Sequence, residues 1–136
     1  MKKLLFALCI CTLISSCKKD LRTKVYQLQT YDNSGVSGSL TLQETNDKTI
    51  TNAHLEAWGM QPSLLYPTHI HEGVIGGLIN IQVDFGKLQT TSGSVEADGK
   101  WYTPYDDALK ANACFTMHKP DTMAKYVLVR NIGKNE

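Results

Sequence analysis

Apolar and polar residues alternate in short stretches along most of this chain, and the stretches recur at intervals of about ten residues. Alternation with a period of two predicts β-strands, because successive side chains of a strand point to opposite faces of the sheet. The clearest stretch is 78–85, in which Ile79, Ile81, Val83 and Phe85 share one parity. We expect strands at 25–30, 36–44, 49–58, 68–72, 78–85, 100–103, 113–118 and 125–131.

One segment breaks this pattern and predicts a single short helix. Residues 104–111 begin with proline, carry Asp106 and Asp107 early and continue with helix-forming residues. Acidic side chains stabilise the first turn of a helix, so we interpret this pair as structural rather than as a catalytic carboxylate dyad. Many short strands with at most one helix indicate an all-β sandwich. A length of 136 residues with 42% hydrophobic residues suits one such domain and leaves no room for two.

The N-terminus has the pattern of a secretion signal. Lys2 and Lys3 precede an apolar stretch at 4–14, which is too short to span a membrane. The following run Leu13–Cys17 resembles the lipobox of bacterial lipoproteins. That resemblance implies cleavage before Cys17, a diacylglycerol on its sulfur, and a protein that this lipid anchors in the cell envelope, at the outer membrane or a periplasmic face. The alternative is an ordinary secreted protein with a chance cysteine at this place.

The predicted organisation is therefore a signal peptide at 1–16, a lipid-anchored tether at 17–24 and one β-sandwich domain at 25–136. Loss of the signal leaves 12 basic side chains against 13 acidic ones, a net charge of −1. This balance argues against a nucleic-acid partner bound by bulk electrostatics. Only Cys114 then remains as a free thiol, so we expect no disulfide within the mature chain.

Three histidines carry the chemical argument. His69 and His71 are two residues apart on a predicted strand and therefore share one of its faces, with Ile70 on the other. His118 ends a second predicted strand. We call His69, His71 and His118 the histidine triad; three imidazoles together suit copper, zinc or another first-row metal. The alternative is a chance His-x-His pair on an exposed strand, and we interpret His54 as structural.

The order of the motifs resembles the copper/zinc superoxide dismutase family. In that family a glycine-led hairpin precedes a His-x-His-Glu strand, as Gly38–Leu42, Trp58-Gly59 and Thr68–Gly73 do here. The run Met117–Asp121 is similar to the strand that ends in the last copper ligand. The resemblance implies an antiparallel Greek-key β-sandwich in which the histidine triad occupies copper-ligand positions.

A second resemblance, to the CHRD domain named for chordin, covers roughly residues 36 to 133. That family has a His-Ile-His-Gly strand, a glycine turn, a Val-rich strand, and a short helix that runs into a strand ending in histidine. The counterparts here are His69–Gly73, Gly77–Ile81 and Ala108–His118. The family's closing Gly-Glu-Ile-Arg-Gly is missing, and Leu128–Asn131 only faintly resembles it.

The chain departs from the dismutase pattern in the parts that complete its active site. No histidine lies between His71 and His118, so the bridging imidazolate and the zinc ligands have no counterpart. Residues Gly73–Gly77 connect their strands directly, where the dismutase has a long zinc loop. No guiding arginine can be assigned either, because the register of Arg130 does not match. What the resemblance then implies is a mononuclear copper site of three histidines without zinc.

Three functions stay open at this point. The first is a copper-binding lipoprotein of the cell envelope without full dismutase activity. The second is a zinc-free copper superoxide dismutase, although a net charge of −1 and the unassigned arginine do not favour capture of an anion. The third, which the CHRD resemblance implies, is a non-catalytic adhesion or assembly module. Resemblance of fold does not decide among them.

Overall fold

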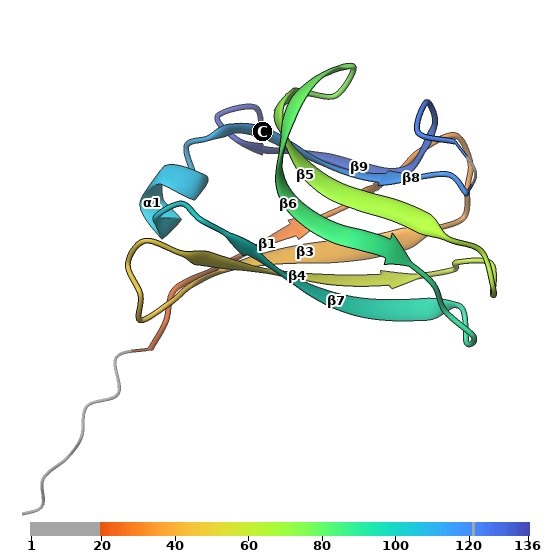
Figure 1. Cartoon of the computed structure of the whole chain (residues 1–136), viewed down its shortest axis with the longest axis horizontal. Helices are drawn as coiled ribbons and strands as arrows, with labels where there is room; N and C mark the ends of the chain where they lie inside the picture. The colour runs from red at the N-terminus through yellow and green to blue at the C-terminus, as the bar shows by residue number, and fades with distance from the viewer. Residues whose placement is uncertain (1–19, 121) are drawn as a thin grey trace, which may run out of the picture.

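The computed structural model describes residues 20–120 and 122–136. Two antiparallel β-sheets, one of four strands and one of five, face each other around a single core (Figure 1). This arrangement confirms the predicted all-β sandwich. The elements are β1 (Thr23–Gln27), β2 (Gln29–Thr30), β3 (Ser37–Glu44), β4 (Thr51–Trp58), β5 (Tyr66–Val74), β6 (Gly77–Leu88), β7 (Ser94–Trp101), α1 (Tyr105–Ala108), β8 (Asn112–His118) and β9 (Tyr126–Gly133).

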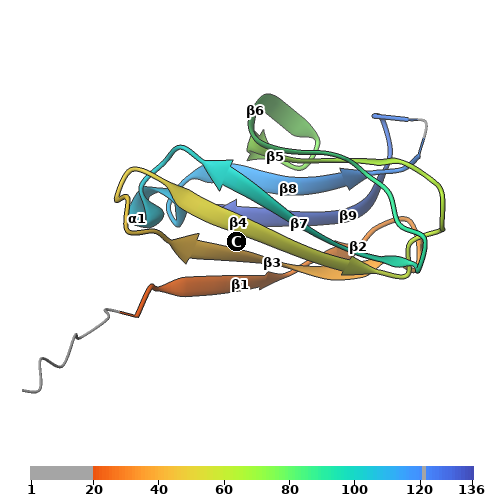
Figure 2. The same ribbon diagram turned by 60° about the horizontal axis from the view of Figure 1, so that its bottom comes forward.

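The strand order shows the Greek-key connections. The four-stranded sheet runs β1-β3-β4-β7 and the five-stranded sheet runs β2-β9-β8-β5-β6. Strand β4 therefore pairs with β7, and β5 pairs with β8, although neither pair is consecutive in the chain. The predicted first strand is divided, since β1 pairs with β3 and β2 pairs with β9. The segment from β1 to β2 thus contributes one edge strand to each sheet (Figure 2).

The core lies between the sheets and is made of alternate residues of the strands. Leu40, Leu42 and Leu55 from the four-stranded sheet have no exposed surface, and neither have Ile70 and Phe115 from the five-stranded sheet. Full burial of such a side chain contributes about 1.5–3 kcal/mol. On β5 and β8 this apolar alternation assigns one face to the core and leaves the other face for polar side chains.

Strand β7 and helix α1 differ in their bounds from the predicted elements. We expected a strand only at 100–103, whereas β7 begins at Ser94. Before Trp101, its inward positions are Val95, Ala97 and Gly99, which are too small to give a clear hydrophobic alternation. The helix expected at 104–111 is only four residues long, because Leu109 already acts as its C-terminal cap.

Strands β5 and β6 are both longer than expected. The turn end of their hairpin curls away from the four-stranded sheet (Figure 1). The side chains of β6 change surroundings as a result. Val83 is 3% exposed within the sandwich, while Ile81 and Ile79, nearer the turn, are 49% and 60% exposed. A register shift separates Val83, which pairs with the core residue Ile70, from Ile81, which pairs with His71. The apolar parity of 78–85 therefore does not keep Ile81 and Ile79 in the core.

The N-terminal end of the sandwich is fixed by an ion network. Arg22 Nε lies 3.0 Å from Glu44 Oε2, and Arg22 Nη1 lies 2.8 Å from Asp106 Oδ1 on α1. Since β1 begins at Thr23, the last residues of the predicted tether 17–24 belong to the folded domain. The predicted signal peptide at 1–16 and Cys17 lie outside the described residues. Within the described part of the chain, no helix has the length and hydropathy needed to cross a membrane.

Candidate metal site

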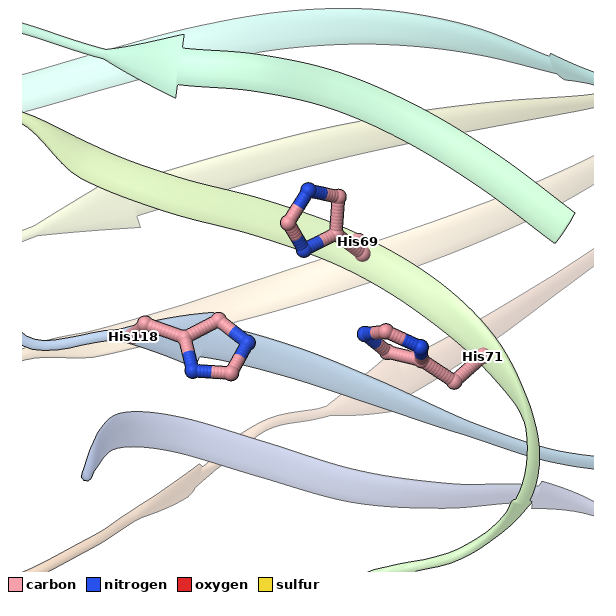
Figure 3. Close-up of side chains that lie close together, drawn as sticks. All are labelled: His69, His71 and His118. Carbon is pink, nitrogen blue, oxygen red and sulfur yellow. The ribbon is translucent and has the colours of Figure 1, made fainter. Parts of the chain in front are cut away.

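The histidine triad meets on the face of the five-stranded sheet that is turned away from the core. His69 and His71 project from β5 and His118 projects from the adjacent β8 (Figure 3). One nitrogen from each ring can be chosen so that all three atoms lie within 4.8 Å of one another. This is the only group of three or more His, Cys, Asp or Glu side chains with metal-binding geometry among residues 20–120 and 122–136.

The pairing of β5 with β8 explains why these three side chains converge. His69 pairs with Thr116 and His71 with Cys114, so the side chains of these four residues share a face. His118 is two residues beyond Thr116 and belongs to the same face. The intervening Ile70 and Met117 have no exposed surface and belong to the core cluster. The predicted parity of both strands is thereby confirmed.

The triad is buried, and each of its rings has a nitrogen without a hydrogen-bond partner. His69 and His71 are each 7% exposed and His118 is 2% exposed. The Nδ1 atoms of His69 and His118, and both nitrogens of His71, are buried without a hydrogen-bond partner. Buried polar atoms in native proteins are almost always hydrogen-bonded, since an unsatisfied one costs about 1–3 kcal/mol. A metal ion at the centre would bind one of these nitrogens from each ring.

Burial also keeps the imidazoles neutral. Removal from water lowers the pKa of each of the three rings, since it disfavours the charged form. Positive charge on His69 would lower the pKa of the other two rings further. Neutral imidazole is the form that offers a lone pair to a metal, so the site is suited to cation binding at neutral pH.

Metal–nitrogen bonds are about 2.0–2.1 Å long. From ligand atoms that lie within 4.8 Å of one another, each ring needs to move by less than about 1 Å to reach a common point at that distance. The ring centroids are 5.3, 5.7 and 6.3 Å apart, and the ring planes are steeply inclined to one another. The rings therefore surround a shared space and do not stack. The residues present fit a metal held by three nitrogens.

Other side chains complete the surroundings of the triad. The Thr116 hydroxyl lies 3.3 Å from His118 Nε2. The ring of Tyr126 packs against that of His118 with centroids 5.0 Å apart. Cys114 lies on the same face of β8 and is fully buried, and burial raises the pKa of its thiol to about 11. This thiol therefore remains protonated at neutral pH and is not activated as a nucleophile.

One carboxylate that sequence reasoning did not place at the site lies beside it. Asp84 Oδ1 on β6 is 3.4 Å from His69 Nε2. The strand alternation alone could not show this, because two one-residue register shifts separate the β5–β6 turn from this pair. Uninterrupted pairing from Gly73 and Leu78 would have placed Gln82 opposite His69; the observed pairing places Asp84 there.

His54 lies in the other sheet, away from the triad. Its Nδ1 is 2.7 Å from Asp98 Oδ1 on the neighbouring strand β7, and the side chain of Asp98 is 85% exposed. This surface pair is in accord with the structural role expected for His54.

Comparison of the chain with protein-family models, with curated proteins and with solved structures found no match. The resemblances to superoxide dismutases and CHRD domains therefore rest on short motifs. The structure supports their coarser content, namely a two-sheet antiparallel β-sandwich that carries a buried cluster of three histidines.

Proposed function

We propose that this protein binds a single copper ion through His69, His71 and His118. The observation that carries the proposal is the convergence of three buried imidazoles, each of which has a ring nitrogen without a hydrogen-bond partner. A purely structural role would leave at least three buried polar atoms unsatisfied at one place, at a cost of about 1–3 kcal/mol each. Coordination of one cation removes this cost.

Copper fits the ligand set better than the other common ions. The three candidate ligands are all neutral imidazoles, and none is a thiolate or a carboxylate. Imidazole suits zinc, copper, iron and nickel, and for a given nitrogen site affinity among first-row divalent ions peaks at Cu(II). Calcium and magnesium require oxygen ligands, so the triad does not suit them.

The proposed setting is the cell envelope. A lipid on Cys17 would hold the chain to a membrane, and the few residues between Cys17 and β1 span at most about 20 Å at roughly 3.4 Å per residue. The sandwich would then lie close to the membrane surface, where it would bind or store copper. The N-terminal signal pattern and the lipobox-like run Leu13–Cys17 support this placement.

The metal content of the protein tests the proposal. The full-length chain, purified in detergent without an affinity tag, is equilibrated with equal concentrations of Cu(II) and Zn(II), dialysed, and analysed by elemental mass spectrometry. We expect one copper per chain and little zinc. Retention of no metal would overturn the proposal, and retention of zinc in preference to copper would overturn its assignment of the ion.

A further inference from the structure

The carboxylate of Asp84 is held in a fixed position before any metal arrives. Thr68 on β5 pairs with Gly86, but the next residue, His69, pairs with Asp84, so Phe85 is an extra residue in β6. Gly86 has φ +80°. Glycine adopts this left-handed conformation more readily than other residues, and it is common at β-bulges. The backbone N–H of Gly86 donates a 2.7 Å hydrogen bond to Asp84 Oδ1. The bulge therefore both places Asp84 opposite His69 and fixes its carboxylate.

The position of Asp84 distinguishes the two nitrogens of His69. Nε2 lies 3.4 Å from Asp84 Oδ1, whereas Nδ1 is buried without a partner. Figure 3 shows a ring nitrogen of His69 turned toward the rings of His71 and His118. In a neutral imidazole one nitrogen carries the proton and the other carries the lone pair. A carboxylate beside Nε2 favours the proton there, which leaves the lone pair of Nδ1 facing the centre of the triad.

The exposure of the two side chains argues against a purely structural contact. The side chain of His69 is 9% exposed, but that of Asp84 is 64% exposed. A contact that reaches so far into solvent contributes little to the stability of the fold. The contact acts instead on the ring of His69. A partner that is hydrogen-bonded to the second nitrogen of a metal-binding histidine sets the tautomer and the orientation of that histidine.

We infer that Asp84 is a positioning residue of the metal site, which accepts the Nε2 proton of His69 and so assigns Nδ1 of this ring as the metal ligand. The expected effect of Asp84 on copper affinity rests on the proposed copper site. Its effect on the tautomer of His69 holds in the metal-free protein as well. Coordination at Nδ1 makes the Nε2–H a stronger donor, and the contact with Asp84 shortens toward the 2.7–3.2 Å of a formed hydrogen bond.

Two measurements on the full-length chain in detergent test this inference. Long-range ¹H–¹⁵N NMR of the metal-free protein reads the tautomer of each histidine. We expect the Nε2–H form of His69 in the natural chain and in Asp84→Asn, which keeps an acceptor oxygen, and a mixture of tautomers in Asp84→Ala. Competition titration then gives the Kd for Cu(II), which we expect to rise by about tenfold or more in Asp84→Ala.

The matched control is Asp98→Ala, which removes the exposed carboxylate beside His54 on the other sheet and should change neither the triad's tautomers nor the copper Kd. Thermal unfolding of Asp84→Ala should stay close to that of the natural chain. An Nδ1–H tautomer of His69 in the natural chain would overturn the inference, and so would an unchanged Kd in Asp84→Ala. If the natural chain bound no copper, the proposed function would fail, and the tautomer measurement would still decide the role of Asp84.

Discussion

The rings of His69 and His118 lie with their centroids 5.7 Å apart, although β6, β7 and α1 separate their strands in the chain. The Greek-key order brings them together, because β8 returns to pair with β5. The two rings come close only when β8 has paired with β5 in the five-stranded sheet. The candidate metal site is thus a property of the assembled sheet, and not of any local segment.

The network at Glu44 predicts a pH-dependent stability. Glu44 is hydrogen-bonded to Arg22 and to Lys48, and these contacts lower the pKa of its carboxyl from its ordinary value of 4.5 to about 2. A lowered pKa means that the folded state favours the charged form. The stabilisation is therefore complete above about pH 4.5 and is lost as the pH falls toward 2.

We accordingly expect Glu44→Gln to lower the free energy of unfolding at pH 7, with a deficit that shrinks as the pH falls from 4.5 to 2. Urea unfolding at a series of pH values measures this. The exposed variant Glu96→Gln is the control and should follow the natural chain. A deficit for Glu44→Gln that was independent of pH would contradict the proposed origin of the stabilisation.

Gly99 predicts a steric limit between the two sheets. A Cβ at this position of β7 would overlap Val83 Cγ1 and lie 3.2 Å from Phe85 Cε1, both on β6. We expect Gly99→Ala to destabilise the fold by about 1–3 kcal/mol through overpacking. At Gly77 the nearest atom to an added Cβ is 3.6 Å away, so Gly77→Ala should stay within about 0.5 kcal/mol in the same denaturation experiment. Equal stability of the two variants would show that β6 and β7 do not pack as described.

The triad could be predicted from the sequence by combining parity, which gives the face of each histidine, with the motif resemblances, which place the strand of His118 beside that of His69 and His71. His69 and His71 share a face of β5 whatever the register of its neighbours, and His118 shares a face with Thr116 on β8. Apolar residues on the alternate positions of both strands indicated which face turns to the core. Fold class and triad therefore followed from alternation together with short motif resemblances.

Asp84 and β7 could not be predicted for physical reasons. The position of Asp84 depends on one-residue register shifts in the β5–β6 hairpin. Alternation along one strand does not show where that strand contains an extra residue relative to its neighbour. Strand β7 fills its inward positions with Val95, Ala97 and Gly99, since β6 approaches too closely for larger side chains at Gly99. Its pattern is therefore weak although its pairing with β4 is complete.

The lipobox-like run predicts a covalent anchor outside the described residues. Because the thioether forms on the sulfur of Cys17, Cys17→Ser should abolish incorporation of labelled palmitate and leave the uncleaved precursor in membranes. Immunoblotting and radiolabelling of cells that express the two chains measure this, with Cys114→Ser as the matched cysteine control. Normal maturation of Cys17→Ser would show that the N-terminus is not a lipoprotein signal.

Dismutase activity is predicted to be low even with copper bound. The chain has no histidine between His71 and His118 to bridge copper to a second metal. Arg130 pairs with Phe115, a core residue, and therefore lies on the face of β9 opposite to the triad's face. Arg130 is therefore not placed to assist the capture of superoxide electrostatically. We expect a rate constant well below the diffusional range of about 10⁸–10⁹ M⁻¹s⁻¹.

Pulse radiolysis of the copper-loaded full-length chain measures superoxide decay directly. Copper-loaded protein and His71→Ala should give similarly slow decay. Near-diffusional decay that disappeared in His71→Ala would establish the zinc-free dismutase in place of the copper-binding protein proposed above.

A Cu(II) titration of four single variants tests most directly whether His69, His71 and His118 together hold one copper ion. The natural chain should bind one equivalent, and His69→Ala, His71→Ala and His118→Ala should each raise the Kd by at least about tenfold, or about 1.4 kcal/mol. His54→Ala removes a histidine of the other sheet and should leave the Kd unchanged. Equal affinity of all four variants, or a loss of affinity confined to His54→Ala, would contradict the account.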